Sequence, residues 1–224
     1  MSTASPSTSH GLFITFEGID GTGKSTQMQL LADWLTQNGY DVVITRNPGG
    51  TAFGQELRQV LLHTTEPVAP LSELLLFIAD RTQHMWDVVI PALQAGKIVL
   101  CDRFMDSTLA YQGYGRGLSM PLIESLNTLA LQETPPHLTL LFDAPPDSLR
   151  VRVHQRGEAD RMEREATAFH ERVREGFLEI ARRHPERIRV FNALDGIHVL
   201  QQAVQDTLQP YLTPLQQEPA FIPS

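Results

Sequence analysis

Cysteine and long apolar runs are nearly absent from this sequence of 224 residues. The single cysteine, Cys101, excludes an internal disulfide framework and is compatible with a reducing compartment. It lies within an apolar run, so we expect a small buried residue and not a nucleophile. No apolar run reaches the length of a membrane span, and residues 1–10, which contain no Lys or Arg, match neither a signal nor a transit peptide. These absences predict a cytoplasmic protein with no membrane partner.

Basic residues are also fewer than acidic ones, and the formal net charge is -8. This balance argues against a nonspecific binder of nucleic acid or of anionic membranes. Lys24 and Lys97 are the only lysines, whereas 11 arginines lie between Arg150 and Arg189. The eight histidines show no metal-ligand spacing, so a zinc site is not expected. An acidic protein that handles anions must concentrate its cations locally, and the arginine-rich segment is the place to look.

Residues 16–26, Phe-Glu-Gly-Ile-Asp-Gly-Thr-Gly-Lys-Ser-Thr, carry the most specific pattern in the chain. They fit the loop that holds phosphate groups, with an apolar run at 12–16 before it and apolar residues at helical spacing after it. In such a loop, backbone N–H groups and a helix N-terminus favour anions. Lys24 is expected to reach the β- and γ-phosphates, and Ser25 to bind Mg²⁺. The predicted triphosphate-binding residues are Gly18, Ile19, Asp20, Gly21, Thr22, Gly23, Lys24, Ser25 and Thr26.

Five apolar runs, at 12–16, 40–45, 98–101, 138–142 and 188–192, alternate with segments of helical periodicity. This order predicts an α/β fold with three layers, a five-stranded parallel sheet between helices. We expect helices at 53–63, 71–95, 121–132, 160–183 and 197–211, with a kink or restart at Pro91. One domain is expected over residues 11–212, after a disordered lead-in at 1–10 and before a flexible tail at 213–224.

Charged residues follow several of the predicted strands, and ligands of such sheets bind at the carboxyl ends of the strands. Arg46 follows the second strand, and Asp102 and Arg103 follow the third. Paired with the phosphate loop, Asp102 has the position of a carboxylate that holds Mg²⁺. Phe77 and Arg81 share one helix face and could stack on a base and bond its edge, although the residues alone favour a core role for Phe77. Residues 107–117, rich in Gly, Tyr and hydroxyl groups, suit a lining segment.

The arginines distinguish among the proteins that use such a loop. No Asn-Lys-x-Asp tetrapeptide is present, which weighs against a GTPase, and the chain is too short for a motor. Arg152, Arg156 and Arg161 flank Gly157, which indicates a mobile lid over phosphates at about 152–163. More arginines than one triphosphate needs suggest two anions in one site, and so phosphoryl transfer to a phosphorylated acceptor. Asp20 would be repelled by a triphosphate and is expected to face a sugar hydroxyl of that acceptor.

The motifs at 16–27, 45–51, 76–81, 102–113 and 156–163 resemble those of the thymidylate kinase family, in the same order and over roughly residues 11–212. The resemblance implies a P-loop nucleoside monophosphate kinase architecture, phosphorylation of dTMP to dTDP by ATP with Mg²⁺, and a homodimer. Two positions depart from the family: Asn47 stands where Glu is usual, and Phe104 replaces a commoner Tyr. A kinase for another nucleoside or nucleotide, such as dUMP or thymidine, and a non-catalytic nucleotide-binding module are the alternatives.

The resemblance also implies roles for individual residues. Lys24 and Arg103 would be catalytic, and so would the lid arginines Arg152 and Arg156. The chain resembles the lid-arginine type of the family, because Gly21 occupies the loop position where other members carry the transition-state arginine. Ser25 and Asp102 would organise the metal. The implied dTMP contacts are Asp20 to the 3′-hydroxyl, Arg46 and Arg103 to the phosphate, Phe77 stacked on thymine, Arg81 to its exocyclic oxygen, Thr108 and Gln112 near the base, and Tyr111 beside the 2′ position.

Overall fold

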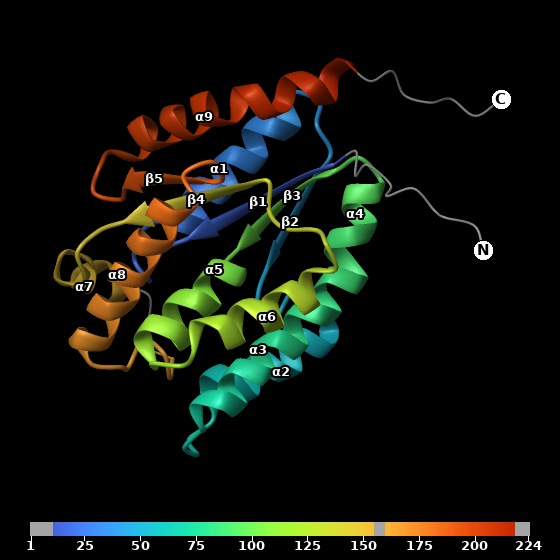
Figure 1. Cartoon of the computed structure of the whole chain (residues 1–224). Coiled ribbons are helices and arrows are strands. Elements are labelled where there is room, and N and C mark those ends of the chain that lie inside the picture. Colours follow the sequence, from blue (N-terminus) through green and yellow to red (C-terminus); the bar gives the residue numbers. More distant parts are fainter. Residues whose placement is uncertain (1–10, 155–159, 218–224) are drawn as a thin grey trace, which may run out of the picture.

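The five apolar runs form five parallel β-strands in one sheet, as the sequence predicts (Figure 1). The computed structural model describes residues 11–154 and 160–217. The order of the strands across the sheet is β2-β3-β1-β4-β5, so the first strand lies at the centre. The strands are β1 (Leu12–Glu17), β2 (Val42–Arg46), β3 (Ile98–Asp102), β4 (Leu138–Asp143) and β5 (Ile188–Asn192).

Helices cover both faces of the sheet, which gives the predicted three layers. Helices α1 and α9 lie together on one side, and α3 and α6 lie on the other, with α8 beside them (Figure 1). None of the helices in the described ranges is long and apolar enough to cross a bilayer. The helices are α1 (Lys24–Gln37), α2 (Ala52–His63), α3 (Pro70–His84), α4 (Ile90–Gln94), α5 (Met105–Thr108), α6 (Met120–Leu131), α7 (Pro146–His154), α8 (Thr167–Arg183) and α9 (Ile197–Gln217), with π-helical turns η1 (Met85–Val89) and η2 (Leu109–Gly115).

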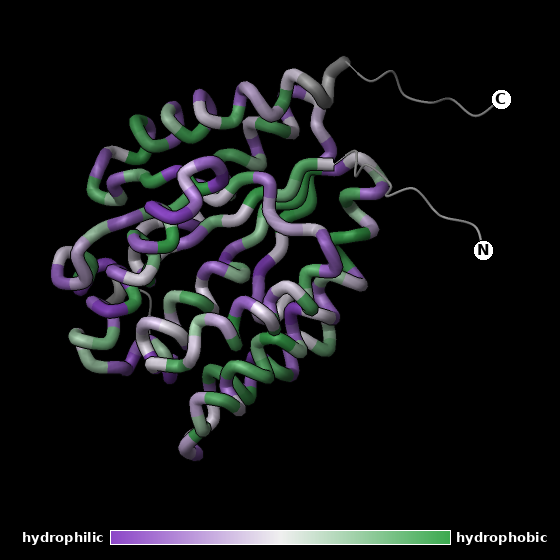
Figure 2. Tube along the Cα trace, in the orientation of Figure 1, coloured by the Kyte–Doolittle hydropathy of each residue, from purple (hydrophilic) through white to green (hydrophobic). Residues whose placement is uncertain are grey.

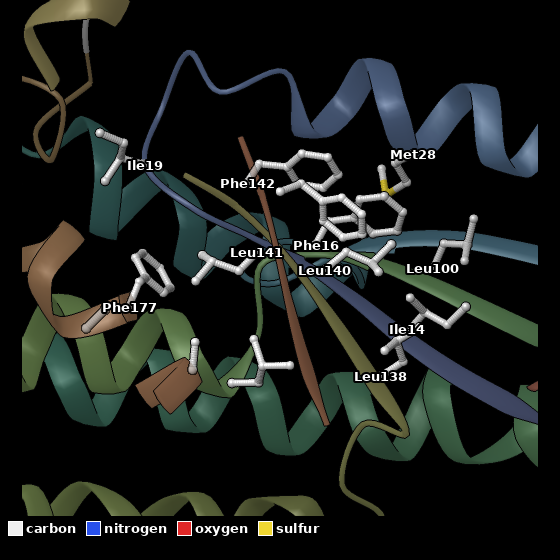
Figure 3. Close-up of a cluster of buried hydrophobic side chains, with 14 of the residues drawn as sticks. Ile14, Phe16, Ile19, Met28, Leu100, Leu138, Leu140, Leu141, Phe142 and Phe177 are labelled. Atoms are coloured by element: carbon white, nitrogen blue, oxygen red, sulfur yellow. The ribbon is translucent and has the colours of Figure 1, made fainter. Parts of the chain in front are cut away.

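The core fills both sides of the central strands, which explains why those strands are apolar at successive positions. Every residue of β1 is buried, and apolar residues concentrate along the sheet in Figure 2. Phe16 stacks on Phe142 with ring centroids 6.0 Å apart, beneath Met28 of α1 (Figure 3). On the opposite face, Phe13 packs against Phe104 with centroids 5.0 Å apart. Packing on both faces holds the central strands in place, and with them the polar residues at the strand ends.

The helix predicted at 71–95 consists of α3, η1 and α4. The π-helical turn comes directly before Pro91, which lies in the first turn of α4. Proline cannot donate a backbone hydrogen bond, so a wider turn before it lets the chain continue in the same direction. The disturbance predicted at Pro91 therefore takes the form of a π-helical turn, and the chain remains helical across it.

Two predicted helix boundaries were wrong. Helix α8 begins at Thr167 and not at Asp160, because the Asp160 carboxylate accepts hydrogen bonds from the N–H groups of Met162 and Glu163, at 2.8 and 2.9 Å, and forms a turn. The last helix continues to Gln217 and not only to Tyr211. Its buried residues Leu200, Val204, Leu208 and Leu212 recur every four positions, so its packed face extends past residue 211.

Candidate active site

The phosphate loop lies between β1 and α1, where the sequence predicts it. Gly18 has φ +128°, and a Cβ there would lie 2.2 Å from the Phe142 carbonyl oxygen, so only glycine fits. The Thr22 hydroxyl donates to the Ile19 carbonyl at 2.9 Å and closes the loop on itself. Gly23, with φ +86°, immediately precedes α1. Backbone N–H groups at the start of this helix form an anion-binding end.

Lys24 is buried at the base of the loop. Its Nζ donates to the carbonyl oxygens of Gly18 and Ile19 at 2.9 and 3.0 Å. Burial, with repulsion from Arg103 as the second cause, lowers the pKa of Lys24 to about 8. A buried ammonium group gains more from an arriving phosphate than a solvated one would, because little water screens the attraction.

Ser25 and Asp102 meet beside the loop because β1 and β3 are adjacent. The Ser25 hydroxyl donates to Asp102 Oδ2 at 3.2 Å, and Asp102 Oδ1 is buried without a hydrogen-bond partner among the described residues. A hydroxyl and an orphaned carboxylate oxygen fit a small divalent cation that prefers oxygen ligands. The described residues contain no group of three or more acidic, His or Cys side chains that could hold a metal. The Ser25 hydroxyl and the Asp102 carboxylate suit Mg²⁺, which takes its other ligands from phosphates and water.

Two cavities border the phosphate loop and share several of their lining residues. We call one the aromatic pocket and the other the polar cavity. The polar cavity is lined by Asp20, Lys24, Ser25, Arg46, Asn47, Arg58, Asp102, Arg103, Asp160 and Glu163. The aromatic pocket is lined by Asp20, Asn47, Pro48, Arg58, Leu62, Phe77, Arg81, Arg103, Phe104, Ser107, Thr108, Tyr111, Gln112, Asp160 and Met162.

Seven of the residues expected to bind the acceptor therefore line one pocket, although they come from distant parts of the chain. Phe77 is half-buried and lines this pocket, so it is available to a ligand as well as to the core. The eighth, Arg46, is exposed and lines the polar cavity instead. Asp20 and Arg103 border both cavities. The seven are Asp20, Phe77, Arg81, Arg103, Thr108, Tyr111 and Gln112.

Arg103 lies at the junction of the two cavities. Its φ is +62°, a value uncommon for a residue with a Cβ, and its N–H donates to the Phe16 carbonyl at 2.9 Å. Its guanidinium pairs with Asp20 at 2.9 Å, donates to the Ser107 hydroxyl at 3.3 Å, and lies 5.1 Å from the centre of the Tyr111 ring. Three partners and a fixed backbone hold this arginine in one orientation.

Glu17, which the sequence reasoning missed, supports the segment that carries Arg103. This fully buried carboxylate accepts hydrogen bonds from the Phe104 N–H at 2.7 Å, the Ser107 N–H at 3.3 Å and the Ser107 hydroxyl at 2.6 Å. Burial and the nearby Asp106 raise the pKa of Glu17 to about 7. Its neighbour Asp106 is itself paired with Arg187 at 2.7 Å. The last residue of β1 thus orders the turn that follows β3.

Arg81 is buried at the base of the aromatic pocket among neutral acceptors. Its guanidinium donates to the side chains of Asn127, Asn47 and Thr108 at 2.5, 3.0 and 2.6 Å, and to the Phe104 carbonyl at 3.1 Å. Burial lowers the pKa of Arg81 to about 10. The side-chain amide of Asn47 accepts from Arg81 and donates to Asp80. The neutral side chain of Asn47 thus links Asp80 and Arg81, two charged neighbours on α3.

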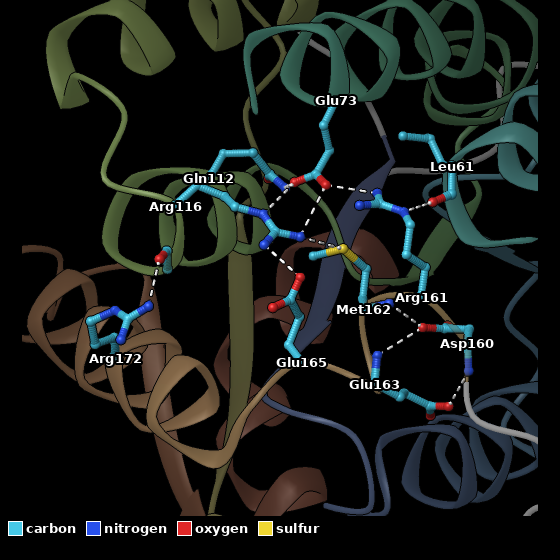
Figure 4. Close-up of polar contacts among 11 residues, drawn as sticks. Leu61, Glu73, Gln112, Arg116, Asp160, Arg161, Met162, Glu163, Glu165 and Arg172 are labelled. Atoms are coloured by element: carbon cyan, nitrogen blue, oxygen red, sulfur yellow. Dashed lines mark hydrogen bonds and ion pairs between the residues drawn. The ribbon is translucent and has the colours of Figure 1, made fainter. Parts of the chain in front are cut away.

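A second network connects the pocket to Arg161, which belongs to the segment predicted as the lid (Figure 4). Glu73 of α3 contacts Gln112, Arg116 and Arg161. Arg161 also donates to the Leu61 carbonyl at 2.8 Å, so it is anchored to α2 and is not a free lid arginine. No local motif marks Glu73, because its partners are 39 or more positions away along the chain.

The segment predicted as the lid, residues 152–163, is described only at 152–154 and 160–163. Arg152 is exposed and donates to the Ala193 carbonyl at 3.1 Å. It lines a third cavity on the outer side of the phosphate loop, together with Gly21, Thr22, Gly23, Thr26, Gln27, Ala193, Asp195, Ile197 and Leu200. The prediction for Arg156 concerns residues 155–159, which lie outside the described ranges.

Comparisons with known proteins show what the chain as a whole is similar to. The family model described as thymidylate kinase matches residues 16–204. The chain is 51% identical over 180 residues to a thymidylate kinase of Carboxydothermus hydrogenoformans, covering 80% of this chain and 88% of that protein. It is 45% identical over 203 residues to a thymidylate kinase of Exiguobacterium sibiricum, covering 90% and 96%. A crystal structure of thymidylate kinase from Ehrlichia chaffeensis matches with a TM-score of 0.74 and 40% identity, covering 89% of this chain and 98% of that chain.

Proposed function

The chain belongs to the thymidylate kinase family, and from this premise we propose which residues perform its reaction. The reaction is the ATP-dependent phosphorylation of dTMP to dTDP, and the protein is a nucleoside monophosphate kinase. The observation that carries the assignment of roles is the position of Arg103 and Asp20, which border both the aromatic pocket and the polar cavity. Two substrates in these adjacent cavities would bring their phosphates together beside Arg103.

ATP binds through the phosphate loop, residues 18–26. The N–H groups at the start of α1 surround the phosphates, and Lys24 supplies positive charge at the base of the polar cavity. Ser25 and Asp102 hold a divalent metal, which we assign as Mg²⁺. When bound, the metal neutralises charge on the phosphate oxygens.

The aromatic pocket receives dTMP. Phe77 stacks on thymine, Arg81 donates to its exocyclic oxygen, and Thr108 and Gln112 lie near the base. Tyr111 limits the space beside the 2′ position, and Asp20 accepts from the 3′-hydroxyl. Arg103 contacts the acceptor phosphate from one cavity and Arg46 reaches it from the other. The pocket walls thereby orient the acceptor before the reaction begins.

The transfer requires no general base. The second pKa of a phosphate monoester is about 6, so the dTMP phosphate is already a nucleophile near neutral pH. One of its oxygens forms a bond to the γ-phosphorus of ATP, the bond from that phosphorus to the bridging oxygen breaks, and the electron pair leaves with ADP. The protein aligns the two groups and stabilises the charge of the transition state through Lys24, Arg103 and the lid arginines Arg152 and Arg156.

We also propose a cytoplasmic homodimer that packs helix against helix. Large apolar side chains are exposed on α3, η1 and α6, which lie on one side of the molecule (Figure 1). Such residues are typical of a surface covered by a partner. Light scattering of the wild type and of Leu129→Glu, at a side chain that is 75% exposed, tests this, with a dimer expected only for the wild type. The exposed residues are Leu71, Leu75, Trp86, Leu122 and Leu129.

Initial rates with ATP and Mg²⁺ against dTMP, dUMP, UMP, AMP and thymidine test the assignment. We expect dTMP to give the highest kcat/KM, because the polar cavity offers arginines to an acceptor phosphate and the aromatic pocket places Phe77, Arg81 and Tyr111 around its base and sugar. A preference for thymidine over dTMP would contradict the proposal, and so would tight ATP binding without phosphorylation of any acceptor.

A further inference from the structure

Glu73 is a buried carboxylate whose partners all come from outside its own helix. It lies in the first turn of α3 and is 0% exposed. Oε1 accepts from Gln112 Nε2 at 2.8 Å, and Oε2 accepts from Arg116 Nη2 at 3.2 Å and lies 2.7 Å from Arg161 Nη2 (Figure 4). The side chain therefore joins η2, which lines the pocket, to Arg161 near the C-terminal end of the segment predicted as the lid.

Glu73 is ionised at neutral pH. Burial opposes ionisation, but hydrogen bonds from Arg116 and Gln112 outweigh it and lower the pKa of Glu73. An ionised carboxylate only accepts hydrogen bonds. It therefore determines which arm of the Gln112 amide faces it, since only the NH₂ arm can donate. This conclusion follows from chemistry and is independent of how the two amide atoms are assigned.

The remaining arm of that amide is the carbonyl, Oε1, which can only accept. Gln112 lines the same pocket as Arg81, whose guanidinium can only donate. The two side chains thus offer an acceptor and a donor to the edge of a base. Thymine and uracil match this pair with N3–H and the C4 carbonyl, whereas cytosine presents an unprotonated N3 and an amino group. A flipped Gln112 would turn its NH₂ group toward the pocket and fit cytosine at N3.

We propose that Glu73 is a positioning residue that sets base specificity by fixing the orientation of the Gln112 amide. Glu73 selects pyrimidine monophosphates that carry a proton on N3, and it acts through Gln112 without touching the substrate. The inference rests on the proposed binding of dTMP in the aromatic pocket. It adds a determinant of specificity that is separate from Arg81, because the Gln112 amide that Glu73 orients meets N3 of the base whereas Arg81 meets the C4 oxygen.

Glu73→Gln tests the proposal, since a neutral amide at position 73 can donate as well as accept and no longer dictates the arm that Gln112 presents. The readout is the ratio of kcat/KM for dTMP to kcat/KM for 5-methyl-dCMP, two acceptors that differ only at N3 and C4. We expect Glu73→Gln to lower this ratio ~10-fold, about the effect of one mispaired hydrogen bond. Glu73→Asp keeps an acceptor-only group and is expected to retain more of the discrimination.

Glu165→Gln is the matched control. Glu165 pairs with Arg116 at 2.5 Å in the same network but does not contact Gln112. We expect this variant to keep the wild-type ratio. An equal loss of the ratio in both variants would overturn the proposal, because it would indicate a nonspecific disturbance of the network around Arg116. An unchanged ratio in Glu73→Gln would also overturn it.

Gln112→Met provides a second route should Glu73→Gln fail to fold, because it removes the amide and leaves Arg116 and Arg161 on Glu73. The ratio is expected to fall here as well, and a wild-type ratio in this variant would contradict the inference. Wild-type enzyme that does not phosphorylate dTMP at all would instead refute the proposed function, so the two failures are distinguishable.

Discussion

Arg103 and Asp20 form an ion pair with 2.9 Å between Nη2 and Oδ1, and this pair joins the phosphate loop to the turn after β3. Their side chains are 18% and 27% exposed, so both remain accessible from the cavities that they border. The loop that we propose binds ATP and the turn that we propose contacts the acceptor phosphate are thus held in one arrangement. Changes to either residue should affect the acceptor more than the nucleotide.

Arg103→Lys should lower kcat/KM for dTMP by ~10²-fold, because an ammonium group cannot replace a guanidinium that contacts Asp20 and Ser107 and that we propose also binds the acceptor phosphate. Steady-state rates with dTMP varied at saturating ATP check this. Arg182→Lys on α8, an exposed arginine paired with Glu179, is the control and should behave as wild type. A loss confined to KM for ATP would argue against this role.

Glu17→Gln should change how stability depends on pH. The pKa of Glu17 is raised from 4.5 to about 7, so its contribution favours the fold below pH 4.5 and is lost as the pH rises through 7. The penalty at pH 8 amounts to about 3 kcal/mol, which glutamine does not incur. Urea unfolding at pH 5 and pH 8 should show the variant gaining stability relative to wild type at the higher pH. Glu171→Gln, at an exposed position of α8, should show no such trend.

Lys24 should produce an alkaline limb in the pH profile for ATP. Its pKa is lowered to about 8, so the free enzyme loses this positive charge as the pH rises through that value. We expect kcat/KM for ATP to fall ~10-fold per unit above pH 8. Lys24→Arg, although slower, should lack this limb because arginine keeps its charge. A limb that persists in the arginine variant would assign it to another group.

Arg156→Ala should lower kcat by ~10³-fold with little change in KM for dTMP if this lid arginine stabilises the transition state. Arg150→Ala is the control, because Arg150 is exposed and pairs with Asp147 on α7. Single-turnover rates separate the chemical step from product release. Should turnover be unchanged, the role passes to Arg152, which borders the outer side of the phosphate loop.

Local sequence patterns predicted the phosphate loop and the elements on either side of it. The strand at 12–16, the loop beginning at Gly18 and the helix after it follow from apolar runs, glycines and spacing over about 20 residues. The ends of β2 and β3, with Arg46 and Asp102, follow from the same logic, because parallel strands end at one edge of a sheet. The start of α8 was misplaced, since a side chain of Asp160 competed with the helix for backbone N–H groups.

Only the tertiary structure decided which distant side chains support the site. Glu17 is 87 positions from Phe104 and Glu73 is 39 positions from Gln112, and neither separation leaves a mark in local composition. A buried carboxylate must find its hydrogen-bond donors wherever the fold brings them, because leaving it unpaired is too costly. The sequence by itself determined that this protein binds a nucleoside triphosphate on a parallel α/β sheet. The packing of α3, η2 and the turn after β3 decided how firmly Arg103 and Gln112 are held, since those contacts exist only when the chain is folded.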